Sequence, residues 1–323
     1  MLAIQASRTG GPDVLEAVDI AVPEPGPGQI RIRHEAIGLN FIDTYHRSGL
    51  YPAKMPAVLG QEGAGIVEAI GEGVTRFHVG TRAAYGTGPI GAYAQAHVVP
   101  ANRAVHLPDG VSTRVAAAAM LKGMTAEFLL RRCYPLGAGE SVLIHAAAGG
   151  VGGILTQWAK ALGAVVIGAV GSPDKAAVAR RQGCDHVIEY RGEDIAARVK
   201  AITGGQGVRV VYDGVGAATF EASLASLGRR GMLVSFGNAS GPAPAIEPIR
   251  LARGGSLFLT RPTLFDYVAT DEDLDASAAA LFHVIETGAV KIDIGQTFPL
   301  AEARRAHEAL EARETTGQTL LIP

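Results

Sequence analysis

The sequence predicts a two-domain α/β protein, in which a β-rich first third precedes a parallel sheet with helices on both faces. Three observations predict this class. The chain has 323 residues, more than the roughly 250–300 at which single domains usually stop. Strand-like segments separated by turns occupy the first third. From about residue 121, short apolar runs alternate with helical segments, which is the pattern of βαβ units.

The composition excludes several other classes of protein. With 48% hydrophobic and 19% charged residues, the chain has enough apolar content for sizeable cores and is not disordered. A formal net charge of −2 gives no positive field for nucleic acids or acidic membranes. The longest apolar runs, such as Val115–Leu121 and Ala164–Val170, fall far short of the ~20 residues that span a bilayer.

The termini and cysteines indicate a cytoplasmic protein. The N-terminus lacks the basic segment and apolar core of a signal peptide. Only Cys133 and Cys184 are present, with no C-x-x-C motif, which fits a reducing compartment in which both thiols pack inside the fold.

The first third of the chain predicts a compact antiparallel barrel or sandwich. Residues Gln29–Ile37 alternate apolar and polar positions, as a strand with one buried face does. Gly63–Ile70 and Tyr93–Val99 are predicted as further strands, each after a stretch rich in Gly or Pro. Strands joined by turns rather than helices favour an antiparallel arrangement.

After Leu121 the alternation of strands and helices predicts a parallel sheet buried on both faces. A helix follows the first strand and runs through Trp158 to Leu162, and Ser172 and Pro173 supply the N-cap and first residue of the next helix. Six strands are expected, at Ser141–Ala146, Ala164–Val170, His186–Glu189, Val208–Tyr212, Met232–Phe236 and Ser256–Thr260.

The last segment, from about Phe265, predicts two amphipathic helices, Leu274–Glu286 and Glu302–Ala312, and a final apolar run, Thr319–Ile322. It shows no strand rhythm of its own. We expect it to pack back on the first domain, which makes that domain discontinuous.

A glycine-rich motif, His145–Gly153 (HAAAGGVGG), lies directly after a predicted strand and before a predicted helix. Gly149 and Gly152 stand where the second and third glycines of G-x-G-x-x-G belong, and Ala147 replaces the first. Small residues let backbone N–H groups approach a pyrophosphate at a helix N-terminus. In this strand–turn–helix context the motif predicts a dinucleotide site rather than an ordinary tight turn.

The end of the second strand of the alternating region predicts NADPH rather than NADH. An NAD enzyme places Asp or Glu about 20 residues past the glycines, where it accepts from the ribose hydroxyls. No acidic residue occurs from Ser141 to Pro173, and Lys175 lies in the helix that follows Gly171 and Ser172. Tyr190, at the end of the third strand, is predicted as a second donor to a 2′-phosphate.

Several segments together resemble the NADPH:quinone oxidoreductases, the zinc-free, zeta-crystallin-like family of the medium-chain dehydrogenase/reductase superfamily. The resemblance runs from Gly10 to Pro323, and it is strongest at Gly38–Tyr45, Arg47–Pro52, Gly60–Gly65, Leu121–Thr125, His145–Gly153 and Ser235–Asn238.

The resemblance implies an α/β fold with a GroES-like β-barrel domain and a Rossmann doubly wound parallel-sheet domain. Residues 1–123 and 264–323 would form the GroES-like catalytic domain, and residues 124–263 the Rossmann NADPH-binding domain. It also implies a homodimer that reduces a quinone or another electron-poor acceptor.

The resemblance also implies that no metal is bound. Zinc dehydrogenases of the superfamily hold catalytic zinc with a Cys and with the His of a Gly-His-Glu motif. The matching positions here look like Asn40 and Gln61, although Glu62 remains. Zinc needs four N, S or O ligands, usually Cys and His. Two cysteines are too few for a four-cysteine structural zinc lobe, and no such ligand spacing occurs elsewhere.

Further site residues follow from the resemblance alone. Asn40 and Tyr45 are the expected catalytic residues, bordering the nicotinamide and the substrate. The expected cofactor-binding residues are Phe41, Phe128, Gly149, Gly150, Val151, Gly152, Gly171, Ser172, Lys175, Tyr190, Val215, Gly237, Asn238, Pro262, Leu264 and Arg313. Lys122 and Thr125 lie near the domain boundary, and neither is assigned a role.

Two other functions stay open at the sequence level. A double-bond reductase acting on alkenals or enones would use the same hydride geometry. An NADPH-binding protein with a structural or RNA-binding role is the other alternative. An RNA-binding surface needs clustered Lys and Arg with interleaved aromatics, but the chain offers short pairs such as Arg131-Arg132 and Arg229-Arg230, with 6% aromatic residues.

Overall fold

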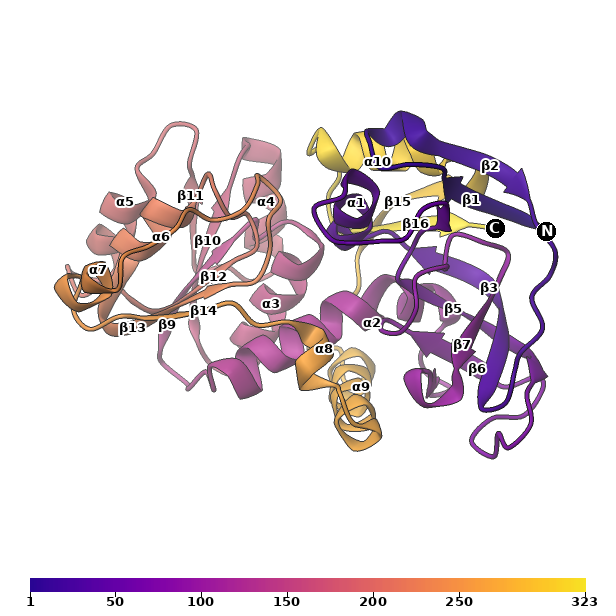
Figure 1. The fold of residues 1–323 in the computed structure, drawn as a ribbon. Coiled ribbons are helices and arrows are strands. Elements are labelled where there is room, and N and C mark those ends of the chain that lie inside the picture. The colour runs from indigo at the N-terminus through magenta and orange to yellow at the C-terminus, as the bar shows by residue number, and fades with distance from the viewer. The chain divides into compact units, whose positions relative to one another are not determined.

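A computed structural model describes residues 1–323, which form two compact units (Figure 1). The first unit comprises residues 1–124, 268–286 and 292–323, and the second comprises residues 125–267 and 287–291. The chain leaves the first unit once to build the second and then returns. The domain boundaries expected from the sequence, at 123/124 and 263/264, stay predictions.

The first unit contains two β-sheets. A three-stranded sheet has the order β2-β1-β4, and a larger one has the order β15-β16-β3-β5-β6-β8, with β7 paired to β3. All strand pairs are antiparallel except β15 with β16. The strands are β1 (Leu2–Ala6), β2 (Leu15–Asp19), β3 (Gln29–Gly38), β4 (Ala57–Val58), β5 (Glu62–Ile70), β6 (Arg82–Tyr85), β7 (Ala96–Pro100), β8 (Val105–His106), β15 (Ile294–Pro299) and β16 (Gln318–Ile322).

Four α-helices accompany these sheets: α1 (Phe41–Ser48), α2 (Thr113–Phe128), α9 (Asp271–Glu286) and α10 (Ala303–Glu311). The last turn of α2 passes into the second unit. Short 3-10 turns lie at Pro12–Val14, Ala101–Arg103 and Leu300–Glu302.

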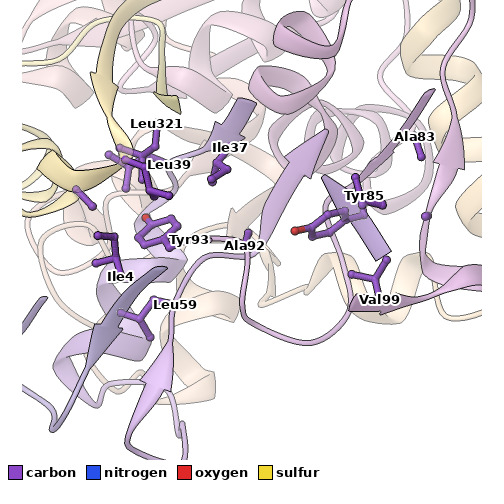
Figure 2. Close-up of a cluster of buried hydrophobic side chains, with 14 of the residues drawn as sticks. Ile4, Ile37, Leu39, Leu59, Ala83, Tyr85, Ala92, Tyr93, Val99 and Leu321 are labelled. Atoms are coloured by element: carbon purple, nitrogen blue, oxygen red, sulfur yellow. The ribbon is translucent and has the colours of Figure 1, made fainter. Parts of the chain in front are cut away.

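The core of the first unit forms between these sheets because their strands alternate in burial. In β3, Ile30 and Ile32 are fully buried, while Arg31 between them is only half-buried. This is the period of two expected for a strand with one buried face. Figure 2 shows part of the cluster, with Ile4 from β1 and Leu321 from β16 among the packed side chains. The first and last strands of the chain thus share one core.

The second unit holds a six-stranded parallel sheet with the order β11-β10-β9-β12-β13-β14. Its strands are β9 (Ser141–His145), β10 (Val165–Val170), β11 (His186–Glu189), β12 (Val208–Asp213), β13 (Leu227–Ser235) and β14 (Phe258–Thr260). Its helices are α3 (Gly150–Ala161), α4 (Pro173–Arg181), α5 (Ile195–Ile202), α6 (Phe220–Ser226), α7 (Pro248–Arg253) and α8 (Leu264–Tyr267), and a π-helical turn spans Leu129–Cys133.

This sheet confirms the predicted doubly wound arrangement. The inner residues of β9 and β10 are buried without interruption, as strands covered on both faces must be. Strand order reverses at β9, which pairs with both β10 and β12. Ligands of such sheets bind beyond the carboxyl ends of the strands at this switch point.

Three sequence-based predictions about strands need correction. The predicted strand Tyr93–Val99 begins only at Ala96, because Tyr93 bonds instead to Leu59 O and Ile4 N. The sixth strand begins at Phe258 rather than Ser256, whose φ of 58° is left-handed. The tail does contain a further strand, β15, which was missed because an edge strand without a fully buried residue lacks a strong apolar pattern.

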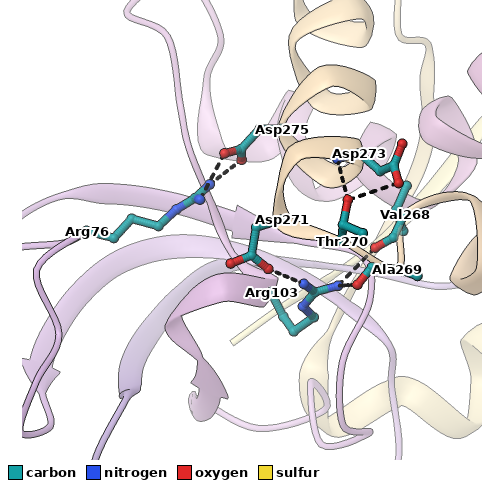
Figure 3. Close-up of polar contacts among 8 residues, drawn as sticks. All are labelled: Arg76, Arg103, Val268, Ala269, Thr270, Asp271, Asp273 and Asp275. Carbon is teal, nitrogen blue, oxygen red and sulfur yellow. Dashed lines mark hydrogen bonds and ion pairs between the residues drawn. The ribbon is translucent and has the colours of Figure 1, made fainter.

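The returning tail is fixed to the first unit by arginines (Figure 3). Arg103 Nη1 donates to Val268 O at 2.9 Å, and its other terminal nitrogen pairs with Asp271 at the start of α9. Arg76 donates to Asp275 one turn later. No helix of this chain has the length and apolar content needed to cross a bilayer.

A buried arginine anchors α1 to α10. Arg47, only 2% exposed, lies in the last turn of α1. Its Nη1 bonds to His307 Nδ1 at 2.8 Å, its Nη2 to Glu311 Oε1 at 2.6 Å and its Nε to Gly10 O at 3.1 Å. The guanidinium therefore has a partner on each of its three nitrogens.

This anchor fixes the direction of a buried hydrogen-bond chain. Arginine has no acceptor, so His307 Nδ1 accepts from Arg47, and the neutral ring donates from Nε2 to Tyr93 Oη at 2.9 Å. Tyr93 then donates to Asp43 Oδ2 at 2.9 Å, which also accepts from Asn40 N–H. Burial lowers the pKa of His307 to about 3 and raises that of Asp43 to about 7.

Replacing this arginine should destabilise the fold. Arg47→Met leaves His307 and Glu311 without their partner, and removing one member of a buried ionic network costs about 3–5 kcal/mol. Arg304→Met is the matched control, because Arg304 forms an exposed pair with Glu308 within α10 and such pairs contribute at most about 0.5 kcal/mol. Urea unfolding measures both. A loss below 1 kcal/mol for Arg47→Met contradicts this account of the anchor.

Candidate functional site

The predicted glycine-rich turn connects β9 to α3 and leaves no room for a side chain at Gly152. Ala146 adopts a left-handed φ of 51°, and Gly149 is the N-cap of α3. A Cβ on Gly152 would lie 2.2 Å from Ala146 O, so only glycine allows the first turn of α3 to pack this closely on the loop. No acidic residue lies in that first turn, and the positive end of the helix dipole therefore remains available for an anion.

The second group of predicted residues gathers at the ends of β10 and β11. Ser172 caps α4 and accepts from Lys175 N–H at 3.4 Å, and Pro173 is the first helical residue, as predicted. A Cβ on Gly171 would lie 2.5 Å from Tyr190 Oη, which places the tyrosine hydroxyl against this turn. Lys175 is half-buried and Tyr190 is 36% exposed.

The third group lies beyond β12 and β13. Val215 O accepts from Ser240 N–H at 2.8 Å, and a Cβ on Gly237 would lie 2.3 Å from Gly214 O. The structure thus brings Val215 together with the predicted Gly237 and Asn238. With its amide oriented to satisfy both atoms, Asn238 accepts from Arg261 Nη2 at 3.1 Å.

Sequence reasoning missed the residues that hold this third group. Asp213, at the end of β12, accepts from the backbone N–H groups of Val215 and Gly216 and from the side chains of Thr219 and Ser223. The sequence signal that could have identified Asp213 is an acidic residue at the end of a predicted buried strand. Arg261 also donates to Ser235 O at 2.9 Å, and it links Asn238 to the segment that contains Pro262 and Leu264.

One residue of the second unit has another role in the structure. Phe128 is only 1% exposed and stacks on Tyr267, with ring centroids 4.3 Å apart. This arrangement is that of a packing residue, and the expected contact of Phe128 with the cofactor stays a prediction.

In the first unit the predicted residues lie on and before α1. Asn40 is the N-cap residue, and Phe41 and Tyr45 follow one turn apart with ring centroids at 6.4 Å. Tyr45 also packs edge-on against Tyr51. Arg313 is exposed in a left-handed conformation after α10, and its role toward the cofactor stays a prediction.

The two positions matched to zinc ligands are engaged as hydrogen-bond donors. Asn40 Nδ2 donates to Glu62 Oε2 at 2.8 Å, and Gln61 Nε2 donates to Gly88 O at 2.7 Å. No set of three or more His, Cys, Asp or Glu side chains lies in an arrangement that could hold a metal ion.

Glu62 is the centre of a buried polar cluster. It is fully buried, and its Oε1 accepts from Leu121 N–H at 2.8 Å. Its Oε2 accepts from Asn40 and forms an ion pair with Lys122 Nζ at 3.5 Å. Burial raises the pKa of Glu62, while the Lys122 charge and the hydrogen bonds lower it. Lys122, to which the sequence assigned no role, is thus part of this cluster.

Comparisons with known proteins agree with this architecture. Residues 26–109 match the model of the alcohol dehydrogenase GroES-like domain, and residues 150–282 match that of the zinc-binding dehydrogenases. A barrel unit and a nucleotide-binding unit of these two types define the medium-chain dehydrogenase/reductase class.

Full-length relatives narrow the class. The chain is 55% identical over 321 residues to a quinone oxidoreductase of Pseudomonas aeruginosa and 48% identical over 323 residues to quinone oxidoreductase 1 of Escherichia coli, with 99% of each chain covered in both cases. The chain belongs to the quinone oxidoreductase family. It is also 43% identical to a 2-haloacrylate reductase of Burkholderia, covering 100% of this chain and 99% of that one.

Solved structures give the same result. The E. coli quinone oxidoreductase complexed with NADPH has a TM-score of 0.98 and 48% identity, with 100% of both chains covered. A mycobacterial protein complexed with NADPH has a TM-score of 0.97 and 50% identity, also with full coverage.

Proposed function

We propose that this protein is a zinc-independent NADPH:quinone oxidoreductase. The observation that carries the proposal is a pairing of two features. In the dinucleotide turn Gly152 packs against Ala146 O, and β10 ends at Gly171 and Ser172 without the ribose-binding acid of NAD enzymes. The quinone oxidoreductases at 48–55% identity over the full chain support the acceptor class.

The residues of the second unit fit NADPH. The start of α3 receives the pyrophosphate through Gly149, Gly150, Val151 and Gly152. Lys175 and Tyr190, beside Gly171 and Ser172, receive the 2′-phosphate. The expected nicotinamide-side residues are Phe128, Val215, Gly237, Asn238, Pro262 and Leu264.

The first unit contributes the residues expected to border the electron acceptor. Asn40, Phe41 and Tyr45 border the nicotinamide and the acceptor, and Arg313 contacts the cofactor phosphates. Bound NADPH supplies a hydride. Reduction of a conjugated carbonyl needs a placed hydride donor and a proton, whereas alcohol oxidation gains from a Lewis acid. Asn40 and Gln61 in hydrogen-bonding roles support metal-free reduction.

A second candidate function is reduction of a conjugated double bond in an alkenal, enone or haloacrylate. The 43% identity to the 2-haloacrylate reductase over the full chain favours it. The same site serves both reactions, because each acceptor takes a hydride at one end of a system conjugated to a carbonyl.

A substrate panel tests the proposed function. NADPH oxidation is followed with p-benzoquinones, naphthoquinones, alkenals and haloacrylates, and NADP⁺ reduction is followed with alcohols. We expect the highest kcat/KM with a quinone and no turnover of alcohols. A higher kcat/KM with alkenals or haloacrylates selects the second candidate, and turnover of alcohols alone contradicts both.

Repeating the quinone assay after dialysis against a strong chelator tests whether activity needs a bound metal ion. Quinone reduction should be unchanged, and metal analysis of the purified protein should find no stoichiometric zinc. Loss of turnover on zinc removal overturns the metal-free proposal.

Lys175 should set the preference for NADPH. A hydrogen bond to a charged group contributes about 1.5–3 kcal/mol, so Lys175→Ala should lower kcat/KM for NADPH about 10- to 100-fold, with salt favouring the lower end. Use of NADH should hardly change. Lys200→Ala, an exposed lysine of the same unit, should affect neither cofactor. An equal loss for both cofactors in Lys175→Ala contradicts the assignment.

The proposal includes a cytoplasmic homodimer. Cys133 and Cys184 are unpaired thiols, in keeping with a reducing compartment. β14 is an edge strand, and its Phe258 is 53% exposed, a feature that proteins usually cover. Light scattering should give a dimer for the wild type and a monomer for Phe258→Lys. A monomeric wild type at micromolar concentration overturns this arrangement.

A further inference from the structure

Three buried polar side chains meet at one oxygen of Glu62. Asn40 is 3% exposed, Lys122 is 7% exposed and Glu62 is fully buried. Both Asn40 Nδ2 and Lys122 Nζ approach Glu62 Oε2, at 2.8 and 3.5 Å. A Cβ on Gly38 would lie 2.2 Å from that same oxygen, so the backbone closes the cluster on this side.

Two atoms of the cluster lack hydrogen-bond partners. Lys122 Nζ makes the ion pair with Glu62 and no hydrogen bond, and Asn40 Oδ1 has no donor. A buried polar group without a partner costs about 1–3 kcal/mol, and more when it is charged. Such groups call for an explanation, often a catalytic role. The two atoms are therefore candidates to bind a ligand.

The two atoms demand opposite ligand chemistry. Asn40 Oδ1 only accepts, whereas the Lys122 ammonium only donates. A quinone or enone presents carbonyl oxygens, which only accept. The acceptor carbonyl therefore matches Lys122, and Asn40 Oδ1 matches a hydroxyl or amide donor.

Neighbouring tyrosines are already committed as donors. His34 Nδ1 lies 2.7 Å from Ala94 O and must donate to it, so His34 Nε2 accepts from Tyr85 at 2.9 Å. Tyr93 donates to Asp43. Burial raises the pKa of both tyrosines well above 10. Neither hydroxyl has a proton to offer without breaking a buried bond.

We propose that Lys122 is a catalytic residue that binds the acceptor carbonyl and protonates it after hydride transfer, with Glu62 as its counter-ion. This inference rests on the proposed function. A carbon–hydrogen bond of NADPH breaks with its electron pair, and the hydride adds to the acceptor. The resulting hydroquinone or enolate anion takes a proton from the ammonium: an N–H bond breaks and an O–H bond forms. The neutral amine then regains a proton from water.

Lys122→Met tests the role. General acids contribute about 10²–10⁴-fold, and a single donor to a developing oxyanion about 10²–10³-fold, so kcat with a quinone should fall at least 100-fold. The dissociation constant for NADPH, from fluorescence titration, should stay within about twofold of wild type. Lys54→Met removes an exposed lysine of the same unit and should leave kcat unchanged.

A double variant addresses folding. Lys122→Met leaves Glu62 buried without its counter-ion, which can unfold the chain. Lys122→Met with Glu62→Gln removes both charges, and it should fold, bind NADPH and show the same loss of kcat.

Amine rescue separates proton donation from a structural role. Methylammonium or ethylammonium added to Lys122→Ala should raise its kcat at least tenfold. The rescued rate should depend on the pKa of the added amine. A folded Lys122→Met or double variant that reduces quinones within threefold of wild type overturns the proposal, as does a folded Lys122→Ala without rescue. A wild type inert toward every quinone and enone overturns the proposed function instead, and this inference with it.

Discussion

The first unit depends on one constraint, the burial of the Glu62 carboxylate. An ion inside a protein is tolerated only when donors replace its water, and here the donors come from separate elements. Asn40 brings the start of α1, and Leu121 and Lys122 bring the middle of α2. Glu62 is the first residue of β5, so its carboxylate connects β5 with α1 and α2 at one point. Gly38 is required at the end of β3, since any side chain there would strike Glu62 or Ala117 O. A buried anion thus sets the geometry of this part of the first unit.

The second unit meets a different constraint, the close packing of turns and helices at the ends of its strands. Ala146 in a left-handed conformation and Gly152 without a side chain let α3 begin against the end of β9. Gly171 does the same for Tyr190 beside α4. Asp213 then holds the turn after β12 through backbone and hydroxyl donors. In each case a strand ends, and either a small residue or a carboxylate that accepts hydrogen bonds allows the next turn to pack closely.

Much of this architecture could be predicted from the sequence, because buried parallel strands produce continuous apolar runs. β9 and β10 were placed for that reason, to within a residue at their ends. The Ser172 cap was placed correctly for a different one, because Ser followed by Pro is a signal for the start of a helix. β15 was missed because none of its residues is fully buried and its sequence carries few apolar side chains. The Glu62 cluster could not be found from local pattern, because its members are separated by 22 and 59 residues in the chain. The resemblance alone suggested that Phe128 contacts the cofactor, and this stays a prediction; the structure shows its ring stacked on Tyr267.

The central claim is that Glu62 is ionised and serves as the counter-ion of Lys122. Burial pushes its pKa upward, while the Lys122 charge, the Asn40 amide and the Leu121 N–H oppose that shift. Infrared difference spectroscopy at neutral pH, comparing wild type with Glu62→Gln, reports the protonation state of this one carboxyl. The account predicts that the substitution removes carboxylate bands and no protonated-carboxyl band. Loss of a protonated-carboxyl band would contradict it, because a neutral Glu62 cannot hold the Lys122 ammonium in place.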